Sequence, residues 1–168
     1  MILSKREMLA AIKRGEIIIT PFEKGLVGAC SIDFRLGDEF RLFKGKNKVD
    51  LTDGLDYLKL TKPATKPEGI ELQSGEMVLG VTLERLSLSQ KYCGWIQGRS
   101  RIARMGLMVH VSSGLIQPGV DNKQVLEIVN LSPNAITLKP GVPICQVSFE
   151  VLSSEASYEG EFAKQSKP

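Results

Sequence analysis

The sequence has little histidine and cysteine, and this scarcity excludes several kinds of catalytic site. His110 is the only histidine among 168 residues, so sites built on clustered histidine ligands are excluded. No Gly-x-Ser-x-Gly segment is present either, which weakens the case for a Ser-His-Asp hydrolase. Cys30, Cys93 and Cys145 are odd in number and far apart, so they predict neither a disulfide framework nor a zinc ribbon. His110 itself lies in an apolar segment, and we interpret it as a strand residue hydrogen-bonded near the core.

Long apolar runs and a large excess of one charge are also missing. No stretch approaches the roughly 20 apolar residues needed to cross a bilayer, and the N-terminus lacks the apolar core and cleavage site of a signal peptide. The net charge of +3 is too small and scattered to predict binding to DNA or RNA. Hydrophobic residues make up 42% and charged residues 24%, which is typical of one globular domain. We expect a cytoplasmic protein that binds neither membranes nor nucleic acid polymers.

The remaining pattern predicts one short N-terminal helix followed by many strands. Ser4 and Glu7 form a capping box ahead of an apolar helical stripe, and Gly15 ends the helix. Beyond it, apolar residues recur with period two between turn residues, and Gly37-Asp38 is predicted to be one of the turns. Many short strands predict a β-sandwich or β-barrel. The predicted strands are 16–20, 31–36, 39–43, 69–72, 77–83, 92–97, 107–111, 124–130, 136–138 and 144–152.

Two segments lack this periodicity. Residues 44–69 are rich in Lys, Pro and Gly and are predicted to form a long excursion over the surface. Residues 153–168 carry Tyr158 and Phe162 in a polar background without a period. Such a tail is usually mobile, although an arm with two aromatic residues can instead close over a ligand. We therefore divide the chain into a domain at 1–152 and a C-terminal arm at 153–168 that is mobile without a ligand.

A carboxylate in an apolar strand is the first candidate for chemistry. Glu127 lies within residues 124–130 and shares one face with Val125 and Val129, while Leu126 and Ile128 share the other. Both faces are apolar, so the strand is predicted to be buried on both sides. An ionised carboxylate in such a place is costly unless it is compensated. The alternatives are a catalytic carboxylate and an edge residue paired with an arginine.

Three arginines gather just before this strand. Ser100 is predicted to cap, and Gly106 to end, a short helix that carries Arg101 and Arg104 on one side, with Arg99 just before its first turn. Guanidinium groups so close together repel one another unless an anion joins them, and arginine pairs well with phosphate oxygens. This segment predicts a phosphate-binding corner, with a solvated basic turn as the alternative.

The segment 98–111, Gly-Arg-Ser-Arg-Ile-Ala-Arg-Met-Gly-Leu-Met-Val-His-Val, resembles the central motif of the dCTP deaminases, which belong to the trimeric dUTPase-like superfamily. Ile-Gln-Pro-Gly at 116–119 and Val-Leu-Glu at 125–127 follow at the family's spacing, and the likeness extends to the N-terminal helix. Residues 44–69 are its weakest part. The resemblance implies a mostly β, distorted jelly-roll-like β-barrel with a short N-terminal helix and a short helix near 100–105, assembled as a homotrimer with active sites between subunits.

The resemblance also implies residue roles. Glu127 matches the catalytic glutamate, while Arg104 and Ser100 match residues that shape the attacking water and the pyrimidine pocket. The run 99–104 matches the segment that holds the nucleotide and its phosphates, the main chain near 112–113 lines the base, and the C-terminal arm closes over the nucleotide. The implied nucleotide-binding residues are Arg99, Arg101, Ile102, Ala103, Ser112, Ser113, Gln117, Val125, Leu126, Tyr158 and Gln165.

Three residues depart from the family pattern. Arg101 replaces a second serine, Gln117 replaces an aspartate, and Glu161 stands where a lysine is common, with Lys164 close enough in sequence to substitute. In dUTPases that aspartate carries the hydrolytic water, so Gln117 argues against dUTP diphosphatase activity. The hypotheses are a dCTP deaminase, a dUTP diphosphatase or bifunctional dUMP-forming enzyme, and a non-catalytic nucleotide-binding relative.

Deamination at C4 of cytosine requires an activated water. Many nucleobase deaminases activate it with zinc held by H-x-E and C-x-x-C segments, and neither segment occurs here, so we expect no zinc. Glu127 is the hypothesised general base, and Arg104 would orient the water or stabilise charge. Magnesium would enter bound to the triphosphate of dCTP or dUTP, without protein ligands of its own.

Overall fold

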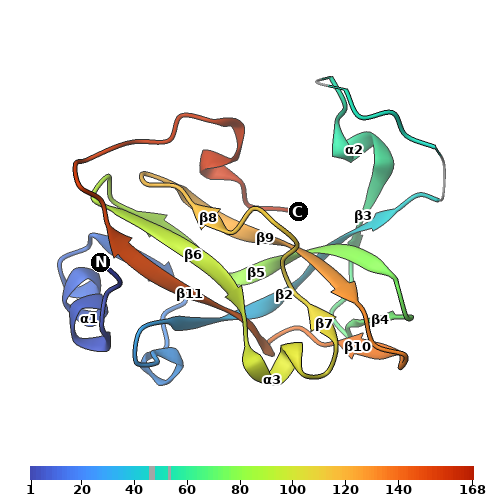
Figure 1. The fold of residues 1–168 in the computed structure, drawn as a ribbon, viewed down its shortest axis with the longest axis horizontal. Coiled ribbons are helices and arrows are strands. Elements are labelled where there is room, and N and C mark those ends of the chain that lie inside the picture. The colour runs from blue at the N-terminus through green and yellow to red at the C-terminus, as the bar shows by residue number, and fades with distance from the viewer. Residues whose placement is uncertain (46–47, 53) are drawn as a thin grey trace.

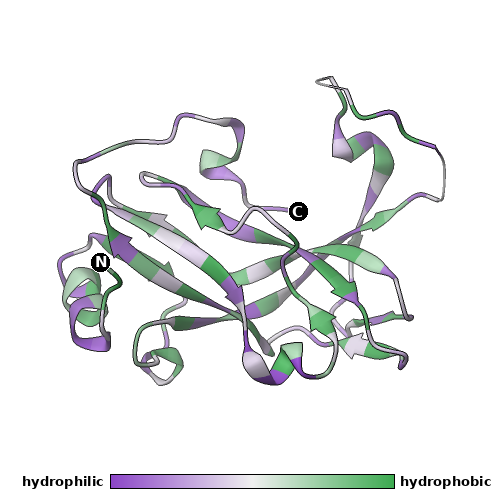
Figure 2. Cartoon of the chain, in the orientation of Figure 1, coloured by the Kyte–Doolittle hydropathy of each residue, from purple (hydrophilic) through white to green (hydrophobic). Residues whose placement is uncertain are grey.

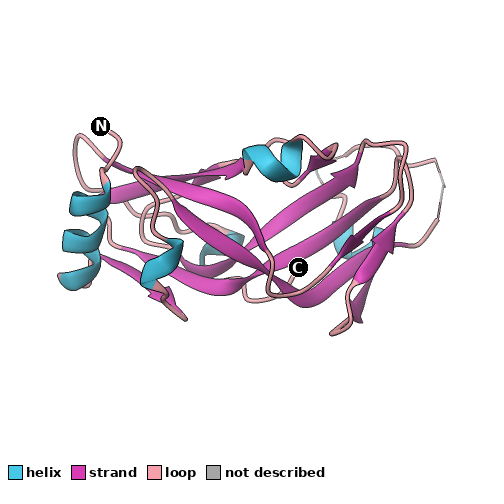
Figure 3. Ribbon diagram, turned by 90° about the horizontal axis from the view of Figure 1, so that it is seen from below, coloured by secondary structure: helices cyan, strands magenta, loops and turns pink. Residues whose placement is uncertain are grey.

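The chain folds into one curled antiparallel sheet with a few short helices around it (Figure 1). The structure is a computed structural model that describes residues 1–45, 48–52 and 54–168. Lys46, Asn47 and Asp53, which belong to the predicted surface excursion, lie outside the described residues. Seen from below, the strands cross the molecule as a curved half-barrel with the helices at its margins (Figure 3). The predicted mostly β architecture is confirmed.

The sheet has nine strands, in the order β7-β9-β5-β2-β11-β6-β8, with β1 paired to β5 and β3 paired to β2. All of these pairs are antiparallel. β4 and β10 form a separate two-stranded sheet. The strands are β1 (Ile17–Thr20), β2 (Ile32–Phe43), β3 (Thr61–Thr65), β4 (Ile70–Leu72), β5 (Met77–Leu88), β6 (Tyr92–Gly98), β7 (Leu107–Met108), β8 (Leu115–Ile116), β9 (Asp121–Asn130), β10 (Ile136–Leu138) and β11 (Pro143–Val151).

The helices are short, and the predicted N-terminal helix is confirmed. Ser4 caps α1 (Lys5–Lys13) by accepting a hydrogen bond from the Glu7 N–H, and Met8 and Ala11 on its apolar side are buried. The others are α2 (Tyr57–Leu60), α3 (Ser100–Ala103) and the 3₁₀ helices η1 (Lys24–Leu26) and η2 (Glu161–Lys164). Within the described part of the chain, no helix combines the length and apolar character needed to cross a bilayer.

The core lies inside the curl of the sheet. Strands alternate buried and partly exposed residues, which is visible as alternating green and purple along the ribbons of Figure 2. Phe34, Phe40 and Phe149, from β2 and β11, are fully buried at the centre of this core. Truncation of such a buried aromatic side chain costs about 3–5 kcal/mol, so these residues contribute strongly to the stability of the sheet.

The structure departs from the predicted strands and turns at five places. Gly37-Asp38 is not a turn, because β2 runs through it with a register shift against β5. A side chain at Gly37 would lie 3.0 Å from the Val81 carbonyl oxygen, so glycine permits close contact between the two strands here. β5 continues to Leu88, the excursion at 44–69 contains α2 and β3, and β8 was not predicted. Of the predicted strand 107–111, only β7 (Leu107–Met108) has strand geometry, and the residues after Met108 form a loop.

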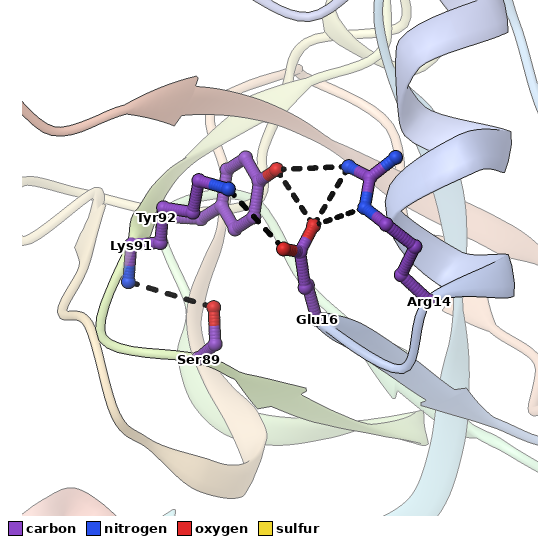
Figure 4. Close-up of polar contacts among 5 residues, drawn as sticks. All are labelled: Arg14, Glu16, Ser89, Lys91 and Tyr92. Carbon is purple, nitrogen blue, oxygen red and sulfur yellow. Dashed lines mark hydrogen bonds and ion pairs between the residues drawn. The ribbon is translucent and has the colours of Figure 1, made fainter.

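A polar cluster ties α1 to the start of β6 (Figure 4). The Arg14 Nε donates to Glu16 Oε2 at 2.8 Å, the Tyr92 hydroxyl donates to the same oxygen at 3.0 Å, and Lys91 Nζ lies 3.2 Å from the other oxygen. The hydrogen bond from Arg14 lowers the pKa of Glu16 to about 2 and outweighs the opposing effect of burial. This cluster is remote from the cleft described next, so its role is to hold the N-terminal helix against the sheet.

Candidate active site

A cleft of about 520 Å³ lies along β9, where the loop after β7, the turn after β8 and the C-terminal arm come together. Glu127 and His110 stand in its wall with apolar residues of β5 and β9 around them. The lining also includes polar side chains of β9 and of the arm, and two aromatic residues, Phe43 and Tyr57. A large, mostly apolar cleft with a few convergent polar groups is typical of a small-molecule site.

Glu127 reaches this cleft because of its place in β9. Leu126 and Ile128 are fully buried in the core, whereas Val125, Glu127 and Val129 on the other face are only partly buried. Glu127 pairs in register with Leu79 of β5, which lines the same cleft. The prediction that this strand is buried on both faces is therefore wrong. Its second face borders the cleft, and the Glu127 side chain is 27% exposed.

The sequence indicated only a structural role for His110, whereas the structure places it against Glu127. Its Nδ1 lies 2.7 Å from Glu127 Oε2, and its side chain is only 7% exposed. The backbone N–H of Val111 donates to the same oxygen at 3.2 Å. Because the strand ends at Met108, the chain turns here and directs both groups at the carboxylate. The interpretation of His110 as a strand residue is therefore wrong, although it is nearly buried as predicted.

The electrostatics of the pair favour charge on both partners. Burial works against an ionised Glu127, but the hydrogen bond and charge of His110, with the Val111 N–H, outweigh it and lower the pKa of Glu127. Burial also disfavours a protonated His110. Its hydrogen bonds to Glu127 and to the Ser113 backbone, with the charge of Glu127, outweigh this effect of burial and raise the pKa of His110. Glu127 is thus a carboxylate at neutral pH, which a general base must be.

The two oxygens of Glu127 differ in their surroundings. The side-chain and loop contacts just described involve Oε2, and among the residues that the structure describes no other side chain bonds to Oε1. One oxygen is therefore held in place while the other remains available to a water molecule or a ligand. A carboxylate fixed in this way can accept a proton in a defined direction.

The C-terminal arm folds back over the cleft. The Tyr158 N–H donates to the Pro118 carbonyl at 3.0 Å, and Asn122 Nδ2 donates to the Phe162 carbonyl at 2.7 Å. The Lys123 N–H donates to the Gln165 carbonyl at 2.9 Å, next to η2. Tyr158, Phe162 and Gln165 therefore line the cleft. In Figure 1 the arm is the red segment that ends near β8 and β9. Movement of this arm stays a prediction.

The arginine segment lies on another part of the surface. Within one chain Ser100, Arg101 and Arg104 do not line the Glu127 cleft. Arg99, rather than Ser100, occupies the N-cap position of α3, without a side-chain capping bond. The reason is that the Arg99 carbonyl already accepts hydrogen bonds from the N–H groups of Ile102 and Ala103. Gly106 ends the turn as predicted, with φ of +83° against Ser132.

The structure thus brings together only part of the predicted site. Six of the predicted residues line the cleft of one chain: Glu127, Ser113, Gln117, Val125, Tyr158 and Gln165. The others lie elsewhere: Leu126 and Ile102 point into the core, Ser112 is exposed beside the cleft, and Arg99, Ser100, Arg101, Ala103 and Arg104 belong to the α3 region. Sequence reasoning missed Asn122 and Lys123, which carried no signal beyond their place in β9.

The described residues also bear on metal binding. In the described ranges, no group of three or more His, Cys, Asp or Glu side chains is placed to hold a metal ion. Cys145 is fully buried, which raises the pKa of its thiol, and burial also raises the pKa of Cys93. That magnesium arrives with the nucleotide stays a prediction.

A half-barrel of antiparallel strands with a carboxylate cleft under a C-terminal arm defines a class of small-molecule enzymes, and comparison with known proteins gives the family. The family model described as dCTP deaminase-like matches residues 2–152. The chain therefore belongs to the dCTP deaminase family of enzymes.

Individual relatives agree with this assignment. The dCTP deaminase of Marinomonas sp. strain MWYL1 is 35% identical, over 93% of this chain and 86% of that protein. The dCTP deaminase of Thermomicrobium roseum is 38% identical over 93% and 82%, and the "dCTP deaminase, dUMP-forming" of Salinispora arenicola is 38% identical over 94% and 83%.

Among solved structures, the 2'-deoxycytidine 5'-triphosphate deaminase of Agrobacterium tumefaciens superposes on 89% of this chain with a TM-score of 0.70 and 19% identity. This chain spans about half of that structure's length, 48%. At this identity the likeness concerns the fold alone, and it agrees with the predicted mostly β architecture.

Proposed function

We propose that this protein deaminates dCTP to dUTP and ammonia, with Glu127 as the general base. The observation that carries the proposal is the state of Glu127: it is partly buried in the cleft, ionised, and fixed through Oε2 by His110 and the Val111 N–H. Membership of the dCTP deaminase family supports cytosine as the base that this carboxylate meets.

The reaction follows from that arrangement. Glu127 Oε1 accepts a proton from water as the hydroxide adds to C4 of cytosine, and the carboxylic acid passes this proton to ring N3. The C4 hydroxyl then gives its proton to the amino group, which departs as ammonia and leaves C4=O. General acid–base catalysis of this kind contributes roughly 10² to 10⁴ in rate. His110 keeps Glu127 oriented and ionised, and the apolar neighbours Leu79 and Val125 keep bulk water away from the base.

The site is completed by a second copy of the chain in this proposal. Ser100, Arg101 and Arg104 are exposed and lie outside the cleft of their own chain. Apolar side chains beside them are exposed as well: Met105 at 51%, Met108 at 40% and Leu131 at 61%. An apolar surface next to functional arginines fits an interface between copies, and the family resemblance implies a homotrimer. Arg104 of one copy would then stabilise charge over Glu127 of another.

Binding of the rest of the nucleotide follows the cleft. Gln117 and Tyr158 line the same cleft as Glu127, so they are available to the deoxyribose of a nucleotide whose base lies at Glu127, and Gln117 can hydrogen-bond the 3′-hydroxyl. Magnesium would enter as the complex of the triphosphate, because the metal prefers phosphate and water oxygens. The cytoplasmic location expected from the sequence stays a prediction.

A dUMP-forming enzyme is the second candidate. Relatives of this kind are as similar as the others, at 38% identity for the Salinispora arenicola protein. Gln117 argues against it, because an amide cannot serve as a base for a hydrolytic water as a carboxylate can.

One assay separates these functions. The purified protein is incubated with dCTP and, separately, with dUTP in the presence of magnesium, and ammonia and pyrophosphate are measured. We expect ammonia from dCTP and no pyrophosphate from either. Pyrophosphate release would establish the dUMP-forming candidate, and nucleotide binding without either product would make the chain a non-catalytic relative.

A further inference from the structure

The three arginines near α3 are not equivalent, because Arg99 is already engaged within the chain. Its Nη2 lies 2.8 Å from Asp33 Oδ2, and its Nη1 donates to the Pro143 carbonyl at 2.8 Å. Asp33 belongs to β2 and Pro143 begins β11, so Arg99 joins the start of α3 to two neighbouring strands of the sheet. Only 29% of its side chain remains exposed.

α3 is held at two further points. Ile102 is buried in the core, and the Gly106 carbonyl accepts a hydrogen bond from the Leu131 N–H at 2.8 Å. A side chain at position 106 would collide with Ser132, at 2.7 Å from its Cβ. The helix, although only one turn long, is thus fixed to the sheet on both sides.

Arg101 and Arg104 are in the opposite situation. Both are exposed, and among the described residues neither side chain takes part in a hydrogen bond or ion pair. They lie three apart on this fixed turn, which places them on the same side of the helix. Because the proposed function assigns Arg104 to the reacting base, Arg101 is the guanidinium group on this fixed turn that remains for a phosphate.

We propose that Arg99 and Arg101 have different roles. Arg99 is a positioning residue for α3, and Arg101 makes the phosphate contact that the resemblance would also allow Arg99 to make. The inference rests on the proposed function, and it deepens it by identifying which side chains recognise the triphosphate. Asp33 neutralises the Arg99 guanidinium and would itself repel a phosphate oxygen. The replacement of a family serine by Arg101 supplies the missing charge.

The test measures binding rather than turnover, so that it does not depend on catalysis. In the full-length Glu127→Gln protein, the Kd values of dCTP and dCMP with magnesium are measured by calorimetry. We expect Arg101→Ser to weaken dCTP binding about tenfold and dCMP binding by less than about twofold. Because Arg99 holds the helix that carries Arg101, Arg99→Gln, where it folds, should also weaken dCTP binding more than dCMP binding; added to Arg101→Ser, it should change the ratio of the two Kd values by less than about twofold.

Asp33→Asn and Arg6→Ser complete the design. Removing the Asp33 charge should not strengthen dCTP binding, whereas a gain would show that Arg99 competes for phosphate and would overturn the proposal. Arg6 is an exposed arginine of α1 paired with Glu7, and its loss should leave both Kd values unchanged. Unchanged dCTP binding in Arg101→Ser would also overturn the proposal. Failure of the parent protein to bind dCTP would instead refute the proposed function itself.

Discussion

Glu84 and Glu127 are carboxylates on neighbouring strands of the same sheet, and their environments are opposite. Glu84 on β5 is 1% exposed, and Arg35 satisfies both of its oxygens: the Arg35 N–H donates to Oε2 at 2.7 Å, and Nε donates to Oε1 at 2.6 Å. Arg35 is also paired with Glu23. Glu127 on β9 is 27% exposed, and the contacts from His110 and Val111 reach only one of its oxygens.

The difference shows how one fold uses the same functional group in two ways. A carboxylate that accepts an arginine hydrogen bond on each oxygen stabilises the packing of two strands and is poorly placed to take up a proton. A carboxylate that is held through one oxygen keeps the other for chemistry. The position of each carboxylate in the sheet determines its environment, because Glu84 lies among buried residues and Glu127 borders the cleft.

The largest loss of activity is expected from Glu127→Gln. The amide keeps the shape of the side chain but cannot take a proton from water, so we predict that ammonia release from dCTP falls by about 10² to 10⁴. The free energy of unfolding should change by no more than about 1 kcal/mol, since the lost ion pair is partly solvated. Ammonia release and urea denaturation measure the two quantities, and near-normal turnover would contradict the assignment.

Glu84→Gln should give the reverse result. Removal of the charge leaves the Arg35 guanidinium beside an uncharged amide, and breaking a buried pair costs about 3–5 kcal/mol. We predict a loss of this size in urea denaturation, with kcat of the folded protein within about twofold of the parent. A large loss of kcat at unchanged stability would mean that Glu84, too, belongs to the catalytic machinery.

His110→Asn should change the pH dependence of kcat/KM. His110 opposes the effect of burial on Glu127 and lowers its pKa. Without the imidazolium, the pKa of Glu127 rises, so the acidic limb of kcat/KM should move to higher pH. The pH profile of the two proteins checks this, and an acidic limb that stays in place would show that His110 does not control the ionisation of the base.

The smallest effect is expected at the polar cluster of Figure 4. The pKa of Glu16 is lowered from 4.5 to about 2, so its contribution to stability is present above pH 4.5 and is lost as the pH falls through about 2. Glu16→Gln should remove this part of the acid dependence of thermal unfolding and leave ammonia release unchanged. An altered turnover would connect the cluster to the cleft.

The sequence predicted the strands better than their connections. Alternation along 124–130 identified Glu127, and the capping box identified α1, because both signals are local. The continuity of β2 through Gly37 depends on a close approach to Val81 in another strand, so the local Gly-Asp pair resembled a turn. Arg99 likewise looked the same as Arg101 in sequence, since its partners Asp33 and Pro143 are distant along the chain.

The candidate site was predictable only in part for the same reason. His110 contacts Glu127 because β7 ends at Met108 and the chain turns there, and the alternation of apolar residues in the sequence does not predict that turn. The family resemblance supplied the roles of Ser100 and Arg104, but a single chain keeps them away from the cleft.

Co-expression of two inactive variants tests whether neighbouring copies share each site. In the proposed oligomer Glu127 and Arg104 of different copies meet at each site, so Glu127→Gln and Arg104→Ala should each be nearly inactive alone. Random mixing in a closed ring pairs an intact Glu127 with an intact Arg104 at about a quarter of the sites, and ammonia release from dCTP should recover to about that fraction. Mixed oligomers that are no more active than the separate variants would contradict the shared site.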